Sequence, residues 1–331
     1  MKLSTLLCAR TLLLGTCMFL PMACGGLEDE TGWDDFAELE DGLVEDSPSA
    51  IAGDDFVVQS PDFDEVEAEE QVWGDAQLNS ASYRIDFTKG KVVAKGQHFE
   101  IAGKRLKLAG NHTWDTVVKF GGKSTPLTAL VGNFTRLWPV EVSRLTTNGA
   151  SDWTTNKEFA ITPLPWKRTN GKFDLDKLNT LYFDRLEAKV KQAEEMGMVV
   201  SVVLFDGAYN RFFGTEEWTK HPLNPNNNLQ GVGPSHVNGI HASGDHVPYQ
   251  RKYVKEVIRR VGGYPNVLFE IGNELHSSSV AWQKSMVRLV KKRSDRPVGV
   301  SYVTSLRDNA WMKTSGADWF APHFSSPTRP A

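Results

Sequence analysis

Alternating apolar and polar positions predict β-structure from Phe99 onward. Phe99 and Ile101 alternate with polar residues, residues 102–104 have the character of a turn, and Leu106 and Leu108 continue the alternation. We therefore expect a hairpin that runs into a first strand. Short apolar runs predict five further strands, at residues 134–140, 199–205, 266–271, 298–302 and, with a weaker pattern, 319–322.

Helical periodicity lies between several of these strands. One apolar stripe ends at Gly197, a second lies between Pro248 and the pair Gly262–Gly263, and a third follows the strand at 266–271. The apolar residues of the three stripes are Leu178, Leu181, Leu186, Val190 and Ala193; Tyr253, Val254, Val257, Ile258 and Val261; and Trp282, Met286, Leu289 and Val290.

Strands that alternate with amphipathic helices predict an α/β fold with a parallel sheet, because parallel strands need long crossover connections. A (β/α) barrel and an open doubly wound sheet both fit this pattern. Residues 109–114, which follow the first strand, contain no glycine-rich phosphate loop, and this disfavours a nucleotide-binding sheet.

The first 24 residues have the pattern of an export signal. Lys2 and Arg10 precede an apolar run at residues 11–20, which is shorter than the roughly 20 residues of a membrane-spanning helix. Cys24 then stands where bacterial lipoproteins carry their lipid, and an ordinary cleaved signal peptide is the alternative. We expect an exported lipoprotein anchored through Cys24 at the outer membrane or cell surface, or otherwise secreted.

Charge divides the remainder of the chain at residue 84. Residues 25–83 contain nineteen acidic residues and no Lys or Arg, which predicts a disordered linker. Residues 84–331, the predicted catalytic domain, carry 35 Lys plus Arg against 22 Asp plus Glu, a balance of +13. The linker is then a solvated spacer or, alternatively, a segment that folds back onto the basic domain.

The candidate chemistry centres on Asn273 and Glu274, which end the strand expected at residues 266–271. In a (β/α) barrel the carboxyl ends of the strands build the active site, and a glycosidase needs a carboxylic acid that protonates the leaving oxygen. Without further context, an Asn-Glu pair at a strand end more often caps a helix or lies in a surface loop.

Several segments together resemble the cellulase-like glycoside hydrolases of clan A, family 5 and its neighbours. The sequence Asn-Val-Leu-Phe-Glu-Ile-Gly-Asn-Glu at residues 266–274 is similar to the fourth-strand motif of that group. Residues 99–113, 133–138, 174–186, 198–207 and 221–228 resemble its first strand, second strand, helix, third strand and following loop. The resemblance implies a (β/α)8 TIM-barrel fold.

By this resemblance Glu274 is the catalytic acid/base, Asn273 binds a sugar hydroxyl beside it, and Arg136 supports the carboxylates. Glu270 is interpreted as a buried hydrogen-bonding partner. His112, Trp114 and Trp138 follow strand ends where sugar contacts are expected, although core packing explains each equally well. His323 is placed near the reaction centre. We expect a polysaccharide or oligosaccharide substrate, no nucleic acid and no cofactor, and we assign no metal, because the histidines at 221, 236, 241 and 246 are irregularly spaced.

The second carboxylate of a retaining glycosidase has no evident candidate. After Glu274 the only acidic residues are Asp295, Asp308 and Asp318, none of which ends a credible strand. We expect only about six βα units and a domain that is incomplete at its C-terminus. The predicted function is a retaining glycoside hydrolase of β-linked saccharides whose nucleophile is missing from this chain. The alternative is a non-catalytic carbohydrate-binding lipoprotein or truncated pseudoenzyme; an α/β esterase ranks lower, because no Gly-x-Ser-x-Gly motif occurs.

Overall fold

A five-stranded parallel sheet forms the centre of the fold. The computed structural model describes residues 84–138, 144–146, 158–207, 218–301 and 310–321. The sheet consists of β5 (Phe134–Leu137), β10 (Val199–Val203), β11 (Val267–Glu270), β12 (Val298–Ser301) and β13 (Trp319–Ala321), adjacent in that order. Five of the six predicted strands are thereby confirmed.

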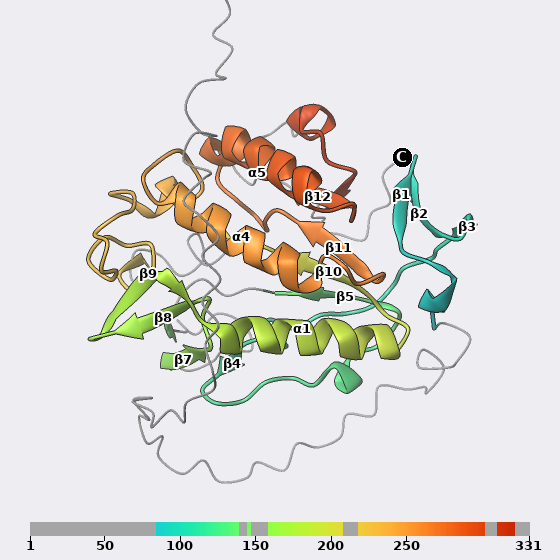
Figure 1. Ribbon diagram of the computed structural model, residues 1–331, viewed down its shortest axis with the longest axis horizontal. Coiled ribbons are helices and arrows are strands. Elements are labelled where there is room, and N and C mark those ends of the chain that lie inside the picture. The colour runs from blue at the N-terminus through green and yellow to red at the C-terminus, as the bar shows by residue number, and fades with distance from the viewer. Residues whose placement is uncertain (1–83, 139–143, 147–157, 208–217, 302–309, 322–331) are drawn as a thin grey trace, which may run out of the picture. The chain divides into compact units, whose positions relative to one another are not determined.

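The sheet is wound in one direction. Its strands follow one another in chain order, and α1 (Thr180–Glu195), α4 (Val247–Val261) and α5 (Val280–Arg293) lie side by side over the same face, as Figure 1 shows. A doubly wound sheet reverses its strand order and carries helices on both faces. The α/β fold class is confirmed, and its winding is that of a (β/α) barrel. Among the described residues the sheet has open edges at β5 and β13.

The three helices contain the predicted apolar stripes, apart from Leu178, and the first two end at the predicted glycines. After α1 the chain turns at Gly197, whose φ of 72° suits the residue that follows a helix C-cap. Pro248 occupies the first turn of α4, which ends before Gly262. The buried residues of these helices pack against strands such as β10 and β11, which are buried on both faces as parallel strands usually are.

A small antiparallel sheet packs near the amino ends of the central strands. It consists of β1 (Val93–Lys95), β2 (His98–Ile101) and β3 (Lys104–Arg105). Phe87, Val92 and Ile101 form a second apolar cluster with Val199 and Leu268 of the central sheet. The predicted turn is present, because Ala102 and Gly103 both have positive φ, 48° and 74°.

The prediction of a strand at residues 106–108 is wrong. The chain there runs beside the segment before β5: Asn133 donates its backbone N–H to Ala109 at 2.9 Å, and Gly110 forms an isolated antiparallel bridge with Gly132. Both glycines lie so close to the opposing backbone that a Cβ would collide with it. The two segments therefore meet at a glycine contact and form no parallel ladder.

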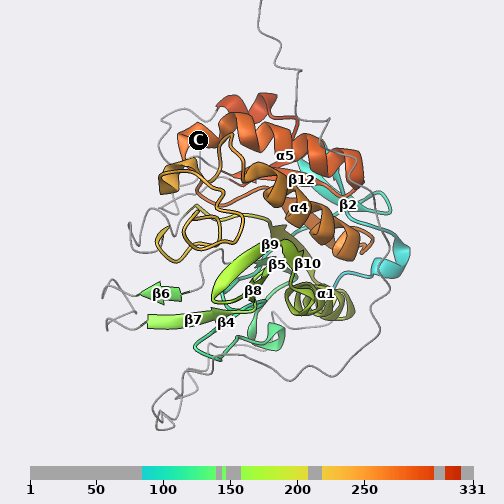
Figure 2. The same ribbon diagram turned by 60° about the vertical axis from the view of Figure 1, so that its left-hand side comes forward.

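Two antiparallel sheets, built from strands between β5 and α1 together with a strand that precedes β5, were not predicted. A three-stranded sheet contains β4 (Lys119–Phe120), β7 (Glu158–Thr162) and β6 (Arg144–Thr146), and β8 (Trp166–Thr169) pairs with β9 (Lys172–Leu178). Figure 2 shows these strands to one side of the parallel sheet. Residues 174–178 thus end a strand, so Leu178 was wrongly assigned to the helical stripe.

Short 3₁₀ helices occupy several connections between these elements. They are η2 (Phe87–Lys89), η3 (Leu127–Ala129), η4 (Val237–Gly239), η5 (Ser277–Ser279) and η6 (Ala310–Thr314).

The predicted leader, Cys24 and the acidic linker lie outside the described residues, so the boundaries at 24 and 83 stay predictions. Contacts divide the chain into Met1–Glu69 and Glu70–Ala331, and every described residue belongs to the second unit. None of the helices found in the described part is long and apolar enough to cross a membrane.

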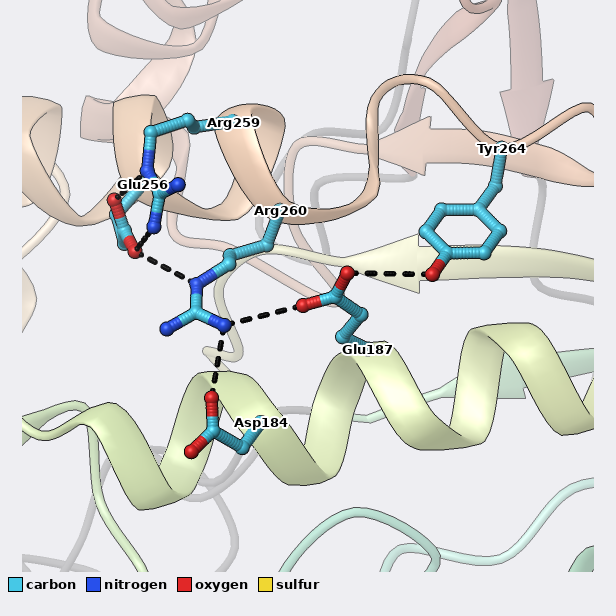
Figure 3. Close-up of polar contacts among 6 residues, drawn as sticks. All are labelled: Asp184, Glu187, Glu256, Arg259, Arg260 and Tyr264. Atoms are coloured by element: carbon cyan, nitrogen blue, oxygen red, sulfur yellow. Dashed lines mark hydrogen bonds and ion pairs between the residues drawn. The ribbon is translucent and has the colours of Figure 1, made fainter.

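Arg260 of α4 joins two helices through an ion-pair network (Figure 3). Its Nη1 donates to Asp184 at 2.8 Å and to Glu187 at 3.1 Å, both on α1, and its Nε donates to Glu256 at 3.0 Å. Burial alone would raise the pKa of Glu256, but hydrogen bonds from Arg259 and Arg260 outweigh it and lower the pKa. Arg260 is therefore the cation that connects α1 to α4.

Arg260→Met should destabilise the fold by about 1–2 kcal/mol, because three carboxylates lose a shared and largely buried cation. Arg259→Met is the matched control: Arg259 is 64% exposed and pairs with Glu256, so its loss should cost less than about 0.5 kcal/mol. Urea unfolding of the full chain measures both. Equal losses of stability for the two variants would contradict the assigned role of Arg260.

Candidate active site

The candidate site lies where three adjacent parallel strands end. Trp138 follows β5, Asp206 follows β10, and Asn273 with Glu274 follows β11. Asp206 and Asn273 form a parallel bridge beyond the regular ladder. Because the carboxyl ends of parallel strands lie on the same side of a sheet, these residues converge there, as predicted for a barrel active site.

A buried ion pair links β5 to β11 across β10. Arg136 donates from Nε to Glu270 at 3.0 Å and from Nη2 at 2.5 Å, so it holds both carboxylate oxygens. Ser201, between them on β10, donates its hydroxyl to Glu270 at 3.1 Å. The Glu270 side chain is fully buried and that of Arg136 is 12% exposed. Glu270 is therefore a buried partner of Arg136, as interpreted from the sequence.

The side-chain amide of Asn273 has a defined orientation. Its Oδ1 accepts from Nη2 of Arg136 at 3.2 Å, and its Nδ2 donates to Oδ1 of Asp206 at 3.3 Å. A cation and a carboxylate thus face opposite ends of one amide, and only one of its two flipped orientations satisfies both. The second carboxylate oxygen of Asp206 accepts from the indole Nε1 of Trp138.

Glu274 has an unusual backbone conformation. Its φ is 50°, in the left-handed region that non-glycine residues seldom adopt. Its side chain is partly exposed, whereas Asn273 beside it is 2% exposed. Strained backbone of this kind often occurs at functional sites. Glu274 is therefore a partly exposed residue directly beside an amide of fixed orientation.

The aromatic candidates form a cluster around Trp138. His112 stacks on its ring, with centroids 5.1 Å apart and planes 14° apart, and Trp114 lies 6.4 Å away. The guanidinium of Arg136 lies 4.1 Å from the centroid of the same ring. Trp138 is only 4% exposed, so its ring supports its neighbours, while exposed His112 and partly exposed Trp114 remain candidates for sugar contacts.

The structure brings together the predicted residues Arg136, Trp138 and Asn273, with Glu274 by sequence adjacency and with His112 and Trp114 against the Trp138 ring. His323 and Cys24 lie outside the described residues, so their predicted roles are neither supported nor contradicted.

Two later carboxylates lie at the amino ends of the parallel strands, opposite to the candidate site. Asp318 immediately precedes β13 and accepts from the backbone N–H of Val298 at 3.0 Å and from Lys291 at 2.6 Å. Asp295 precedes β12 and pairs with Lys91 and Arg296. Both are therefore remote from Glu274 along the strand direction, as expected, and Asp308 lies outside the described residues.

The histidines of the loop before α4 have structural contacts. His221 accepts from the N–H of Leu223, His236 accepts from the N–H of Asn238, and buried His246 contacts the carbonyl of Ile240 at 2.8 Å. Burial lowers the pKa of His246. Within the described ranges, no three His, Cys, Asp or Glu side chains are grouped as metal ligands.

Sequence reasoning missed Asp206 as a member of the site. It is 2% exposed and directly contacts two predicted site residues. A signal was present, since Asp206 is a carboxylate three residues after a fully apolar strand end, in the same position relative to β10 as Asn273 has relative to β11.

Solved structures similar to this chain include glycoside hydrolases. One from Bacteroides vulgatus is 16% identical, with 68% of this chain and 41% of that chain covered and a TM-score of 0.41. A family 5 glycoside hydrolase from the same organism is 11% identical, with 70% and 45% covered and a TM-score of 0.41. A family 5 mannosidase from Rhizomucor miehei, in complex with mannosyl-fructose, is 13% identical, with 71% and 61% covered and a TM-score of 0.44.

No protein-family model matches the sequence, and no curated protein matches it either. The chain spans less than half the length of the first structures it matches, 41% and 45%. Similarities of this size transfer no activity to the chain, and shared architecture alone does not fix function.

Removing Arg136 should leave Glu270 as an uncompensated buried charge. We expect Arg136→Met to destabilise the fold by about 3–5 kcal/mol, and the double variant Arg136→Met/Glu270→Met to recover part of that loss. Arg288→Met, at an exposed position of α5, controls for loss of a surface cation. Denaturant unfolding of the full chain provides the measurement, and a double variant no more stable than Arg136→Met would refute the explanation.

Proposed function

We propose that this protein is a glycoside hydrolase acting on β-linked oligosaccharide or polysaccharide, with Glu274 as its general acid/base. The observation that carries the proposal is the pair Asn273–Glu274 at the carboxyl end of β11, in which the amide is fixed from both sides and Glu274 is a partly exposed residue. The motif at residues 266–274, which resembles that of cellulase-like enzymes, supports the same reading.

In the proposed reaction, the protonated carboxyl of Glu274 donates its proton to the glycosidic oxygen as the bond to the leaving sugar breaks. General-acid catalysis of this kind contributes about 10²–10⁴-fold. Asn273 has one Nδ2 hydrogen directed to Asp206 and a second available for a sugar hydroxyl. Arg136 holds the amide oxygen and, through Glu270, keeps the ends of β5 and β11 in register.

A retaining mechanism further requires a second carboxylate about 5–5.5 Å from the first. Asp295 and Asp318 precede β12 and β13 and so lie at the amino ends of the parallel strands, opposite to Glu274, and neither suits this role. We infer that the described part of the chain provides the acid/base half of the carboxylate pair. We further propose a double-displacement mechanism, in which the nucleophile is neither Asp295 nor Asp318.

Glu274→Gln should abolish proton donation while leaving the shape of the site unchanged. With an oligosaccharide, whose leaving group needs the proton, turnover should fall by about 10²–10⁴-fold. With an aryl β-glycoside whose leaving phenol is already acidic, the first step should be much less affected. Steady-state kinetics on both substrates provides the measurement, and Glu195→Gln, at an exposed position of α1, is the matched control.

Added azide tests for the missing nucleophile in the same assay. If the activated glycoside is turned over only when azide is present, the protein positions the sugar but provides no nucleophile of its own. Sugar binding with no turnover, with or without azide, would favour the non-catalytic carbohydrate-binding protein. An equal loss of kcat/KM, which reports the first step, on both substrates in Glu274→Gln would contradict the acid role.

We also propose that the protein is exported and anchored to a membrane by a lipid on Cys24, with the acidic segment 25–83 as a spacer. Cys24→Ser should move the protein from the membrane fraction to the soluble fraction of a bacterial host. Cys17→Ser, within the expected leader, is the matched control and should leave the distribution unchanged. Persistence of Cys24→Ser in membranes would contradict the anchor.

A further inference from the structure

Asp206 lies between two predicted site residues and contacts both. Its Oδ1 accepts from Nδ2 of Asn273 at 3.3 Å, and its Oδ2 accepts from the indole Nε1 of Trp138. The residue is 2% exposed, and it follows β10, the strand between those that carry its two partners. One buried carboxylate therefore ties together the ends of β5, β10 and β11.

The chemistry of a carboxylate matters at this position. An ionised carboxylate only accepts hydrogen bonds, whereas an asparagine offers one acceptor and one donor. Two N–H groups face Asp206, so an amide there could satisfy one of them and would turn a donor toward the other or leave it unbonded. The carboxylate therefore selects the amide orientation of Asn273, in which Oδ1 faces Arg136.

Gly207 constrains the backbone of the neighbouring strand end. A Cβ on Gly207 would lie 2.6 Å from the carbonyl oxygen of Glu274 and 2.8 Å from Cα of Leu275. Its N–H donates to the carbonyl of Asn273 at 2.8 Å. A glycine at this position lets the segments after β10 and β11 approach closely enough for Glu274 to keep its φ of 50°.

We propose that Asp206 and Gly207 act as a positioning dipeptide for Asn273 and Glu274, and that Asp206 determines sugar affinity through the orientation of the Asn273 amide. This inference rests on the proposed function, because it takes Asn273 as a ligand of a sugar hydroxyl. Asp206 itself touches the amide and the indole, so its role is that of a positioning residue.

The decisive experiment is a double-mutant cycle on sugar binding by the full chain. Calorimetric titration with cellotetraose and mannotetraose gives the Kd and the stoichiometry for wild type, Asp206→Asn, Asn273→Ala and the double variant. Asp206→Asn should raise the Kd about tenfold with unchanged stoichiometry, the effect of one lost hydrogen bond. In the Asn273→Ala background the same change should alter the Kd by less than about twofold, because the group on which Asp206 acts is absent.

Matched controls separate this role from general effects on folding. Asp176→Asn changes an exposed aspartate on β9 that accepts from Gln230 at 2.8 Å, and it should leave the Kd unchanged. Gly207→Ala should raise the Kd by at least about tenfold, whereas Gly263→Ala, at a glycine with open space around its Cα, should not. If Gly207→Ala fails to fold, the cycle at Asp206 still decides the matter.

Each outcome bears on one of the two proposals. A wild-type Kd that Asp206→Asn leaves unchanged overturns the positioning role and leaves the proposed function standing. Additive effects of Asp206→Asn and Asn273→Ala also overturn it, because a merely structural role weakens binding whether or not the amide is present. A wild-type chain that binds neither sugar and hydrolyses none overturns the proposed function, and this inference falls with it.

Discussion

The candidate site depends on one buried ion pair, Arg136 with Glu270. Moving two charges out of water costs several kcal/mol each, and the cost is recovered only when every oxygen and N–H is matched. Here the guanidinium holds both oxygens of Glu270, and Ser201 adds a further hydrogen bond. Ser201 stands between the partners because it pairs with Arg136 on one side and Leu268 on the other. Its small side chain leaves room for Arg136 and Glu270 to meet over the middle strand β10. The ion pair therefore requires β5, β10 and β11 to keep this register.

From that pair a chain of contacts runs to the edge of the sheet. Arg136 binds the oxygen of the Asn273 amide, Asp206 binds its nitrogen, and Trp138 donates to Asp206. Each of these hydrogen bonds restricts the orientation of the next side chain. The backbone of Glu274 is restricted as well, because Gly207 packs against its carbonyl. A buried polar network of this kind is stable only when every member is satisfied. In the proposed function, the partly exposed Glu274 beside Asn273 is the residue that this network would serve.

Apolar runs and helical stripes in the sequence predict the parallel strands and their helices, because burial on both faces leaves a strong pattern. The hairpin of β8 and β9 had a local signal as well: Asn170 and Gly171 have φ of 52° and 80°, as a two-residue turn of the Asn-Gly type requires. Residues 106–108 alternate like a strand, but glycines at 110 and 132 bring the backbone too close for a ladder. Asp206 is a lone acid in the sequence, and nothing local indicates that Asn273, 67 residues later, will donate to it.

The contacts that orient Asn273 beside Glu274 lie in a different part of the sheet from its edge strand β13. All the contacts that orient Asn273 come from β5, β10 and β11 or from residues directly after them, whereas the described sheet continues through β12 to an edge at β13. Among the described residues, the hydrogen bonds that orient the amide and the buried ion pair therefore do not involve β13. If Glu274 is the proton donor, as proposed, it does not require the partner carboxylate to be on the same strands, since acid catalysis and nucleophilic attack use groups on opposite sides of the bond. In the proposed function, the acid half of the site would therefore be a local property of this part of the chain.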